Sequence, residues 1–237
     1  MIKLKELPIV ESIDQLKTLP QGKLLINTIN AHSYNTALKD SLFAEALIKG
    51  DVLIPDGASV VKICKWLKMQ SQPRERIAGW DLFVFEMNRL NEKGGRCMFM
   101  GSSEKVLALI KQRAAVDYPN LEIVTYSPPY KPEFSQEDNA AIVAAINEAN
   151  PDLLWIGMTA PKQEKWIYDN IRLVGAKVAI GVGGSFDVMA GNVKRAPKIF
   201  RRLGLEWFHR LITQPTRWRR MMRLPKFALT VLRTRGR

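Results

Sequence analysis

Cysteine, histidine and long apolar runs are scarce in this sequence. Among 237 residues there are two cysteines, Cys64 and Cys97, and two histidines. With no CxxC pair and no histidine cluster, this composition argues against a structural metal and fits a reducing compartment. No apolar run approaches the roughly 20 residues that cross a bilayer, and the first residues lack the apolar centre of a signal peptide. We therefore expect a cytosolic protein that at most lies on a membrane surface.

Three common nucleotide-binding signatures are also missing. The sequence has no DxD pair, which would hold a metal-bound nucleotide, and no GKS or GKT of a P-loop. The run GVGGSF at residues 181–186 lacks the third glycine of a dinucleotide fingerprint, and that fingerprint is not found near a first strand either. These absences disfavour a nicotinamide-dependent oxidoreductase, which is the rival enzyme class. We expect no metal and no cofactor.

Positive charge is concentrated at the C-terminal end of the chain. Residues 194–237 hold 14 Lys and Arg against one acid, Glu206, whereas residues 1–193 hold 22 basic and 22 acidic residues. The formal net charge of +13 therefore belongs to the tail. A strongly basic segment favours a polyanion, either nucleic acid or an anionic lipid surface. Charge alone does not choose between them.

Apolar strand patterns alternate with helical patterns through the rest of the chain. We expect strands at residues 23–30, 51–57, 96–102, 121–126, 152–158 and 177–187. Helices are expected between them, among them one from about residue 37 to 49, one capped near Ser103, and one with a capping-box start at Ser135. This order predicts an α/β, Rossmann-like fold with a mostly parallel sheet, helices on both faces, and a basic helical C-terminal appendage.

Polar or glycine-rich residues lie at or just after the carboxyl ends of the expected strands, where such sheets bind their ligands. They are Thr28 and Asn30, Asp56, Gln163, and Gly183 and Gly184 with Asp187. An acid beside amide-rich turns can deprotonate a hydroxyl while helix N-termini hold a diphosphate, which is the layout of a group-transfer site. For Asp56 the alternative is a helix cap, because Pro-Asp-Gly is a common turn.

Five segments resemble the WecG/TagA/CpsF family of bacterial glycosyltransferases, family 26, in order and spacing. They are TINAHSYN, LIPDGASVV, ERIAGWDLF, GMTAPKQEKWI and the run from Gly181 to Arg220 that begins GVGGSFDVMAGNVKRAP. The likeness covers roughly residues 5 to 225. The chain departs from the family pattern at Ile29, where members often have proline, and in GMTAPKQE, where the usual form is GxPKQE.

The resemblance implies an inverting transfer from a UDP-sugar to a polyprenyl-diphosphate-linked saccharide, without a required metal. The sugar would be of the hexose type, namely N-acetylmannosamine, its uronate or a hexose. The reaction would take place on the cytoplasmic face of the bacterial plasma membrane, in the synthesis of surface polysaccharides. The expected partners are the UDP-sugar, the lipid-linked acceptor and an anionic membrane surface, with no nucleic acid. The particular sugar, acceptor and oligomeric state stay open, a homo-oligomer included.

The resemblance also assigns roles to single residues. Asp56 matches the proposed general base, and Asp187 is the reserve candidate. The substrate-binding set is Thr28, Asn30, Arg76, Gln163, Gly183, Gly184 and Asp187. Arginines of the tail would lie over the active site and meet the lipid diphosphate and the membrane. They are Arg195, Arg202, Arg210, Arg217 and Arg220.

The tail has the residue pattern of a helix that lies in a membrane interface. Apolar residues form two stripes among its arginines, one at Trp207, Phe208, Leu211 and Ile212 and one at Trp218, Met221 and Met222. Such helices suit the boundary between headgroups and acyl chains, and the alternative is packing against the body. Because apolar and basic residues are interleaved and no recognition module precedes them, a lipid surface is favoured over nucleic acid. We therefore divide the chain into a catalytic domain, residues 1–193, and a basic amphipathic membrane-associating appendage, residues 194–237.

Overall fold

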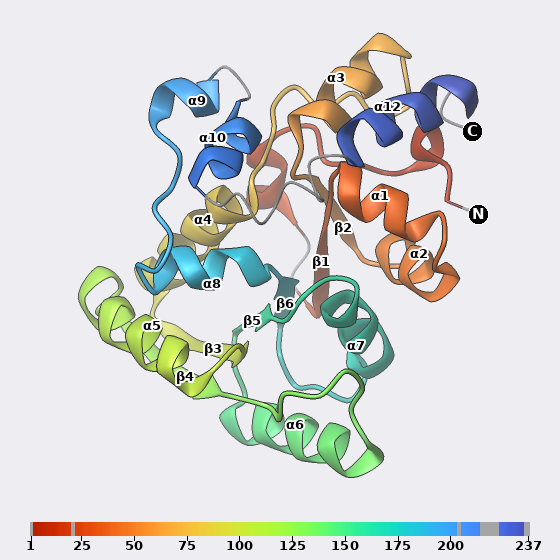
Figure 1. Ribbon diagram of the computed structural model, residues 1–237. Helices are drawn as coiled ribbons and strands as arrows, with labels where there is room; N and C mark the ends of the chain where they lie inside the picture. The colour runs from red at the N-terminus through yellow and green to blue at the C-terminus, as the bar shows by residue number, and fades with distance from the viewer. Residues whose placement is uncertain (1, 20–21, 203–204, 214–222, 235–237) are drawn as a thin grey trace.

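A single parallel sheet forms the centre of the protein. The computed structural model describes residues 2–19, 22–202, 205–213 and 223–234. Within these residues, six strands pair in the order β2-β1-β6-β5-β3-β4, every pair is parallel, and helices cover both faces (Figure 1). The strands are β1 (Leu24–Ile29), β2 (Val52–Pro55), β3 (Gly95–Gly101), β4 (Leu121–Tyr126), β5 (Leu153–Gly157) and β6 (Val178–Gly181). The predicted α/β fold class is confirmed.

Helices connect the strands and continue into the C-terminal segment. The body contains α1 (Ala31–Ala37), α2 (Ser41–Ile48), α3 (Ala58–Trp66), α4 (Gly79–Lys93), α5 (Glu104–Asp117), α6 (Gln136–Ala149), α7 (Lys162–Asn170) and α8 (Gly183–Met189). After residue 193 come α9 (Lys198–Arg202), α10 (Glu206–Thr213) and α12 (Arg223–Thr234), and two short 3-10 helices, η1 (Leu4–Glu6) and η2 (Ile13–Thr18), precede the sheet. None of the helices in the described ranges is long and apolar enough to cross a membrane.

Alternation along the strands builds a core on each face of the sheet. Phe99 and Trp155 belong to a cluster with α4, α5 and α8, whereas their neighbours Met98 and Leu154 belong to one with α6 and α7. Near β1 and β2 a further cluster joins α1, α2, α3 and α12. Successive strand residues point to opposite faces, and both faces are covered. The strands are therefore apolar along nearly their whole length.

The last described helix packs on the body. Phe227 and Val231 of α12 are fully buried, and the Phe227 ring meets the Tyr34 ring of α1 edge-on at 5.5 Å between centroids. This packing does not test the alternative given for the two apolar stripes, because neither stripe lies in α12 and Trp218, Met221 and Met222 lie outside the described residues.

Two expected elements differ from the structure. The single helix expected at residues 37–49 is two helices, because Leu38 ends α1 and the Asp40 side chain caps α2 by accepting from the Phe43 N–H. The last strand, expected to reach residue 187, ends at Gly181, and Gly183 already lies in α8. The caps predicted at Ser103 and Ser135 are confirmed.

Close approach between β3 and β5 generates a prediction about stability. Gly101 has a φ of +113°, and a Cβ there would lie 2.6 Å from the Gly157 carbonyl oxygen. Backbone strain and overpacking together should make Gly101→Ala cost about 2 to 5 kcal/mol of unfolding free energy. Gly191→Ala is the control, because its φ of +78° is also positive but no atom lies within 4 Å of its Cβ position. Urea unfolding measures both, and equal losses would contradict the packing argument.

Candidate active site

Four strand ends bring the predicted residues to one edge of the sheet. β1 lies between β2 and β6, and β6 lies between β1 and β5. Thr28 is paired with Ile54, and Ile156 with Gly181, so these strands end almost level. The residues that follow them share the carboxyl edge of the sheet, where α/β proteins bind ligands.

Asp56 occupies the turn between β2 and α3. Its backbone N–H donates to the Ile29 carbonyl oxygen of β1 at 2.9 Å, and its side chain is 28% exposed. The N-cap of α3 is Gly57, without a side-chain cap hydrogen bond. The helix-cap alternative for Asp56 is therefore wrong, and its carboxylate lies at the ligand edge, open in part to solvent.

Arg76 holds a fixed positive charge beside Asp56. Its Nη2 lies 3.7 Å from Asp56 Oδ1, and its Nη1 lies 2.7 Å from Glu206 Oε2 of α10. Burial by itself lowers the pKa of the guanidinium, but the carboxylates of Asp56, Glu206 and Asp81 outweigh this effect and raise that pKa. Arg76 therefore links the predicted base to the C-terminal segment.

A second ion pair joins the C-terminal segment to the body. Arg195 Nη2 lies 2.5 Å from Asp81 Oδ1 in the first turn of α4. The guanidinium predicted to meet the lipid diphosphate is thus paired with a carboxylate of the body. Arg202 and Arg210 lie in α9 and α10, with side chains outside the described part, and Arg217 and Arg220 lie outside the described residues.

Sequence reasoning missed the two acids of this network, Asp81 and Glu206. A signal for each was present: Glu206 is the one acid among residues 194–237, and Asp81 lies in the segment ERIAGWDLF. Glu206 is almost completely buried, and burying a charge requires a partner. In the described ranges, no group of three or more His, Cys, Asp or Glu could hold a metal ion.

Gln163 connects the start of α7 with the start of α8. Its buried side chain donates from Nε2 to Glu164 Oε1 at 2.8 Å, and its Oε1 accepts from the Gly183 N–H at 3.3 Å. A Cβ on Gly183 would lie 2.4 Å from the Met158 carbonyl oxygen, whereas one on Gly184 would meet nothing within 4 Å. Gly183 is therefore required for close packing, and Gly184 faces open space.

The remaining substrate-binding candidates have different environments. Thr28 is half-buried at the end of β1. Asn30 caps α1, since its Oδ1 accepts from the N–H groups of His32 and Ser33. Asp187 lies in α8, half-buried, and not at a strand end as the sequence suggested.

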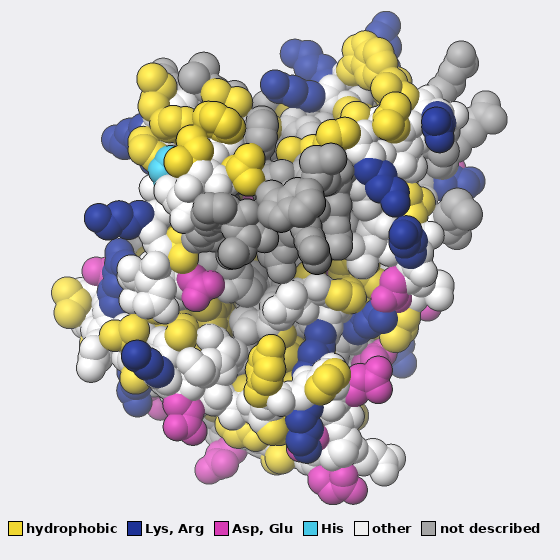
Figure 2. Space-filling model, in the orientation of Figure 1, with side chains coloured by type: hydrophobic (Ala, Val, Ile, Leu, Met, Phe, Trp, Pro, Cys, Tyr) yellow, Lys and Arg dark blue, Asp and Glu magenta, His cyan; other side chains and the backbone are white. Residues whose placement is uncertain are grey.

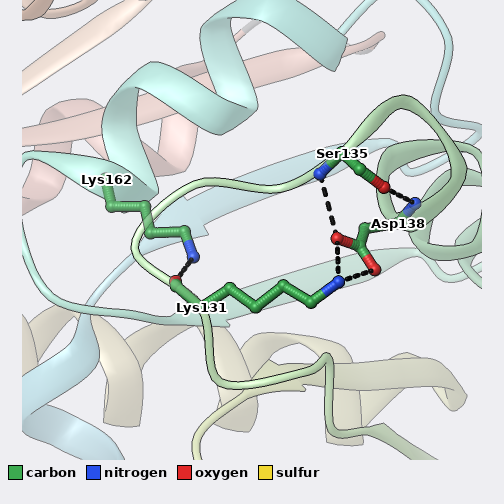
Figure 3. A network of polar contacts seen from close by, with 4 residues as sticks. All are labelled: Lys131, Ser135, Asp138 and Lys162. Atoms are coloured by element: carbon green, nitrogen blue, oxygen red, sulfur yellow. Dashed lines mark hydrogen bonds and ion pairs between the residues drawn. The ribbon is translucent and has the colours of Figure 1, made fainter.

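A polar network fixes the loop beside Gln163 (Figure 3). Lys162 Nζ donates to the Lys131 carbonyl oxygen at 2.5 Å, and Lys131 Nζ pairs with Asp138 at 2.8 Å. Ser135 and Asp138 complete the capping box of α6. The loop after β4 is thereby tied to the first turn of α7.

Burial of Glu164 generates a prediction about pH. Burial raises the pKa of this carboxyl to about 7, although the Gln163 hydrogen bond opposes the shift. An unfolded glutamate has a pKa of about 4.3, so the folded state binds the extra proton between these values and stability falls as the pH rises from about 4.3 to 7. Glu164→Gln removes this penalty and should raise the free energy of unfolding by roughly 3 kcal/mol at pH 8, and by much less at pH 5.

Urea unfolding at both pH values tests this expectation. Glu148→Gln on the exposed side of α6 is the matched control, because it makes the same substitution where no buried carboxyl is relieved. An unchanged pH dependence in Glu164→Gln would show that the group does not titrate in this range.

Known proteins similar to this chain transfer sugars. The sequence profile of the Glycosyl transferase WecG/TagA/CpsF family matches residues 2–237. The chain is 38% identical over 209 residues to the N-acetylglucosaminyldiphosphoundecaprenol N-acetyl-beta-D-mannosaminyltransferase of Bacillus subtilis (strain 168), an alignment that covers 88% of this chain and 79% of that protein. It is 37% identical over 216 residues to the protein of the same name from Bacillus spizizenii, covering 91% and 81%. The chain is a glycosyltransferase and belongs to the WecG/TagA/CpsF family.

Proposed function

We propose that this enzyme moves a hexose-type sugar from a UDP-sugar to a saccharide linked to polyprenyl diphosphate, with inversion at the anomeric carbon. The names of the two relatives make N-acetylmannosamine the first donor sugar to test, and N-acetylglucosaminyldiphosphoundecaprenol the first acceptor. The observation that carries the proposal is the Asp56 carboxylate, partly exposed at the ligand edge of the sheet and held beside Arg76.

Asp56 acts as the general base in this mechanism. An acceptor hydroxyl is a poor nucleophile until a base takes its proton. As Asp56 accepts that proton, the hydroxyl oxygen forms a bond to the anomeric carbon, and the bond from that carbon to the phosphate oxygen breaks. UDP leaves with the electron pair. Attack from the face opposite to UDP inverts the anomeric configuration.

Other residues of the edge hold the donor. We assign Thr28, Asn30 and Gln163 to the pocket, together with the backbone at Gly183 and Gly184, and keep Asp187 as the reserve base. Arg76 places a positive charge next to the reacting hydroxyl. Arginine also donates charge-assisted hydrogen bonds to phosphate oxygens. No metal or cofactor takes part in the proposed step.

Residues 194–237 form the membrane-associating appendage in this proposal, and residues 1–193 the catalytic domain. Phe208 and Ile212 of α10 are exposed, in a segment with a large excess of Arg and Lys. Figure 2 shows hydrophobic side chains together with Lys and Arg over α9 and α10. Arg202, Arg210, Arg217 and Arg220 are assigned to the lipid diphosphate and the anionic headgroups. The site would then work on the cytoplasmic face of the plasma membrane.

Release of UDP tests the proposed reaction. The full chain is incubated with a panel of UDP-sugars and a short-chain lipid diphosphate carrying N-acetylglucosamine. We expect acceptor-dependent UDP release with UDP-N-acetylmannosamine. Release with another single donor would reassign the sugar, and no acceptor-dependent release with any donor would overturn the proposal.

Substitution of Asp56 tests the base. Asp56→Asn keeps the shape of the side chain but cannot take the proton, so turnover should fall on the order of 10²- to 10⁴-fold, while UDP-sugar binding changes little. Asp187→Asn changes the reserve candidate for the base and should lower turnover far less. If Asp187→Asn were inactive and Asp56→Asn nearly normal, the base would be Asp187. Circular dichroism of both variants separates loss of the base from loss of the fold.

A further inference from the structure

One large aromatic side chain of the body is exposed among lysines. Trp66, at the end of α3, is 66% exposed, and Lys62, Lys65 and Lys68 around it are exposed too. Residues three and four apart are neighbours on a helix surface, so Lys62 and Trp66 lie on one outer stripe with Lys65 beside them. We call Lys62, Lys65, Trp66 and Lys68 the α3 surface.

The inner side of α3 explains why this surface points outward. Val60 and Cys64 are fully buried in the cluster shared with α1, α2 and α12. The packing of α3 on the body is thus satisfied by residues on the opposite side. The core therefore does not account for the exposed tryptophan.

α12 presents a surface of the same kind at the same side of the molecule. Leu229 and Leu232 are exposed, as are Lys226 and Arg233. Lys226, Leu232 and Arg233 are each three or four residues from Leu229, so the four share one outer face. α3 and α12 contribute to one core cluster, and both lie in the upper right of Figure 1, away from α5 and α6. Figure 2 shows hydrophobic side chains gathered with Lys and Arg over α3.

We propose that the α3 surface of the catalytic domain docks on an anionic lipid surface, beside α12. Neither α3 nor α12 contains an acidic residue, so the two outer faces complement anionic headgroups and would repel a second copy of themselves. Tryptophan is enriched at the level of the headgroups, and lysine reaches them while its stem lies on apolar groups. An exposed aromatic ring among cations is therefore a better match for an anionic lipid surface than for the same basic surface of a second copy.

Docking through α3 would set the height of the active site above the lipid. The helix starts two residues after Asp56 and runs to Trp66, a rise of about 12 Å at 1.5 Å per residue. The proposed base would thus lie just before the first turn of α3, and the lipid contact would lie at the last residue of the same rigid helix. This inference rests on the proposed function only for the role that docking would have in catalysis. Binding to lipid itself is measured without donor or acceptor.

Binding of the full chain to vesicles tests the proposal. The probes are vesicles of phosphatidylcholine alone and vesicles that also contain phosphatidylglycerol. Each interfacial cation is worth on the order of a fivefold change in affinity, so Lys62→Gln with Lys65→Gln should weaken binding to the anionic vesicles on the order of 10- to 30-fold. The control is Lys105→Gln with Lys111→Gln on α5, which removes the same charge at exposed positions and should change binding little.

A label at position 66 reports contact directly. Cys64 and Cys97 are buried, so Trp66→Cys can carry an environment-sensitive fluorophore, and the same label on Val116→Cys of α5, 79% exposed, is the control. We expect a blue shift of the fluorescence on anionic vesicles at position 66 and none at position 116.

The absence of a shift at position 66, or equal losses of vesicle binding for the two lysine pairs, would overturn the proposal. So would a change of oligomeric state in Trp66→Ala without vesicles, which would make the surface a contact between copies. Failure of UDP release, by contrast, would overturn the proposed reaction and leave these binding results standing.

Discussion

Parallel pairing of all six strands is the constraint on which the candidate site depends. Because the strands run in one direction, their carboxyl ends meet at one edge. Residues as distant in sequence as Thr28, Asp56 and Gln163 therefore lie at or after the ends of β1, β2 and β5 on that edge. The same pairing buries both faces of the sheet, so polar side chains are found where the strands stop. The candidate site therefore lies at the carboxyl ends of the strands, outside the hydrophobic core.

The ion pairs of Arg76 connect this edge to the C-terminal segment. One guanidinium lies between the predicted base, Asp56, and the buried Glu206 of α10, and Arg195 pairs with Asp81 near the same place. A buried acid in so basic a segment needs a cation, and Arg76 supplies it. A shift of α10 would therefore change the surroundings of Asp56, so the proposed membrane contact of the appendage would have a physical route to the proposed base.

Two surfaces of the molecule carry apolar and basic side chains together. α10 exposes Phe208 and Ile212, and α3 exposes Trp66 beside lysines, while α12 turns Phe227 and Val231 inward and two leucines outward. Such surfaces are unfavourable in water and are matched at the headgroup boundary of a bilayer. The enzyme would thus rest on lipid through the body and the appendage together, with the site between them and the donor arriving from water.

The sequence by itself determined the fold class, the family, and most of the strands and caps, because apolar periodicity and capping chemistry act over a few residues. Ser135 and its capping box were readable for that reason. Only the tertiary structure decided that Asp56 does not cap α3, that Asp187 lies in a helix, and that Arg76 meets Glu206 across 130 residues of chain. Ion pairs of this kind depend on where packed elements bring their side chains, and no local pattern in the sequence encodes that distance.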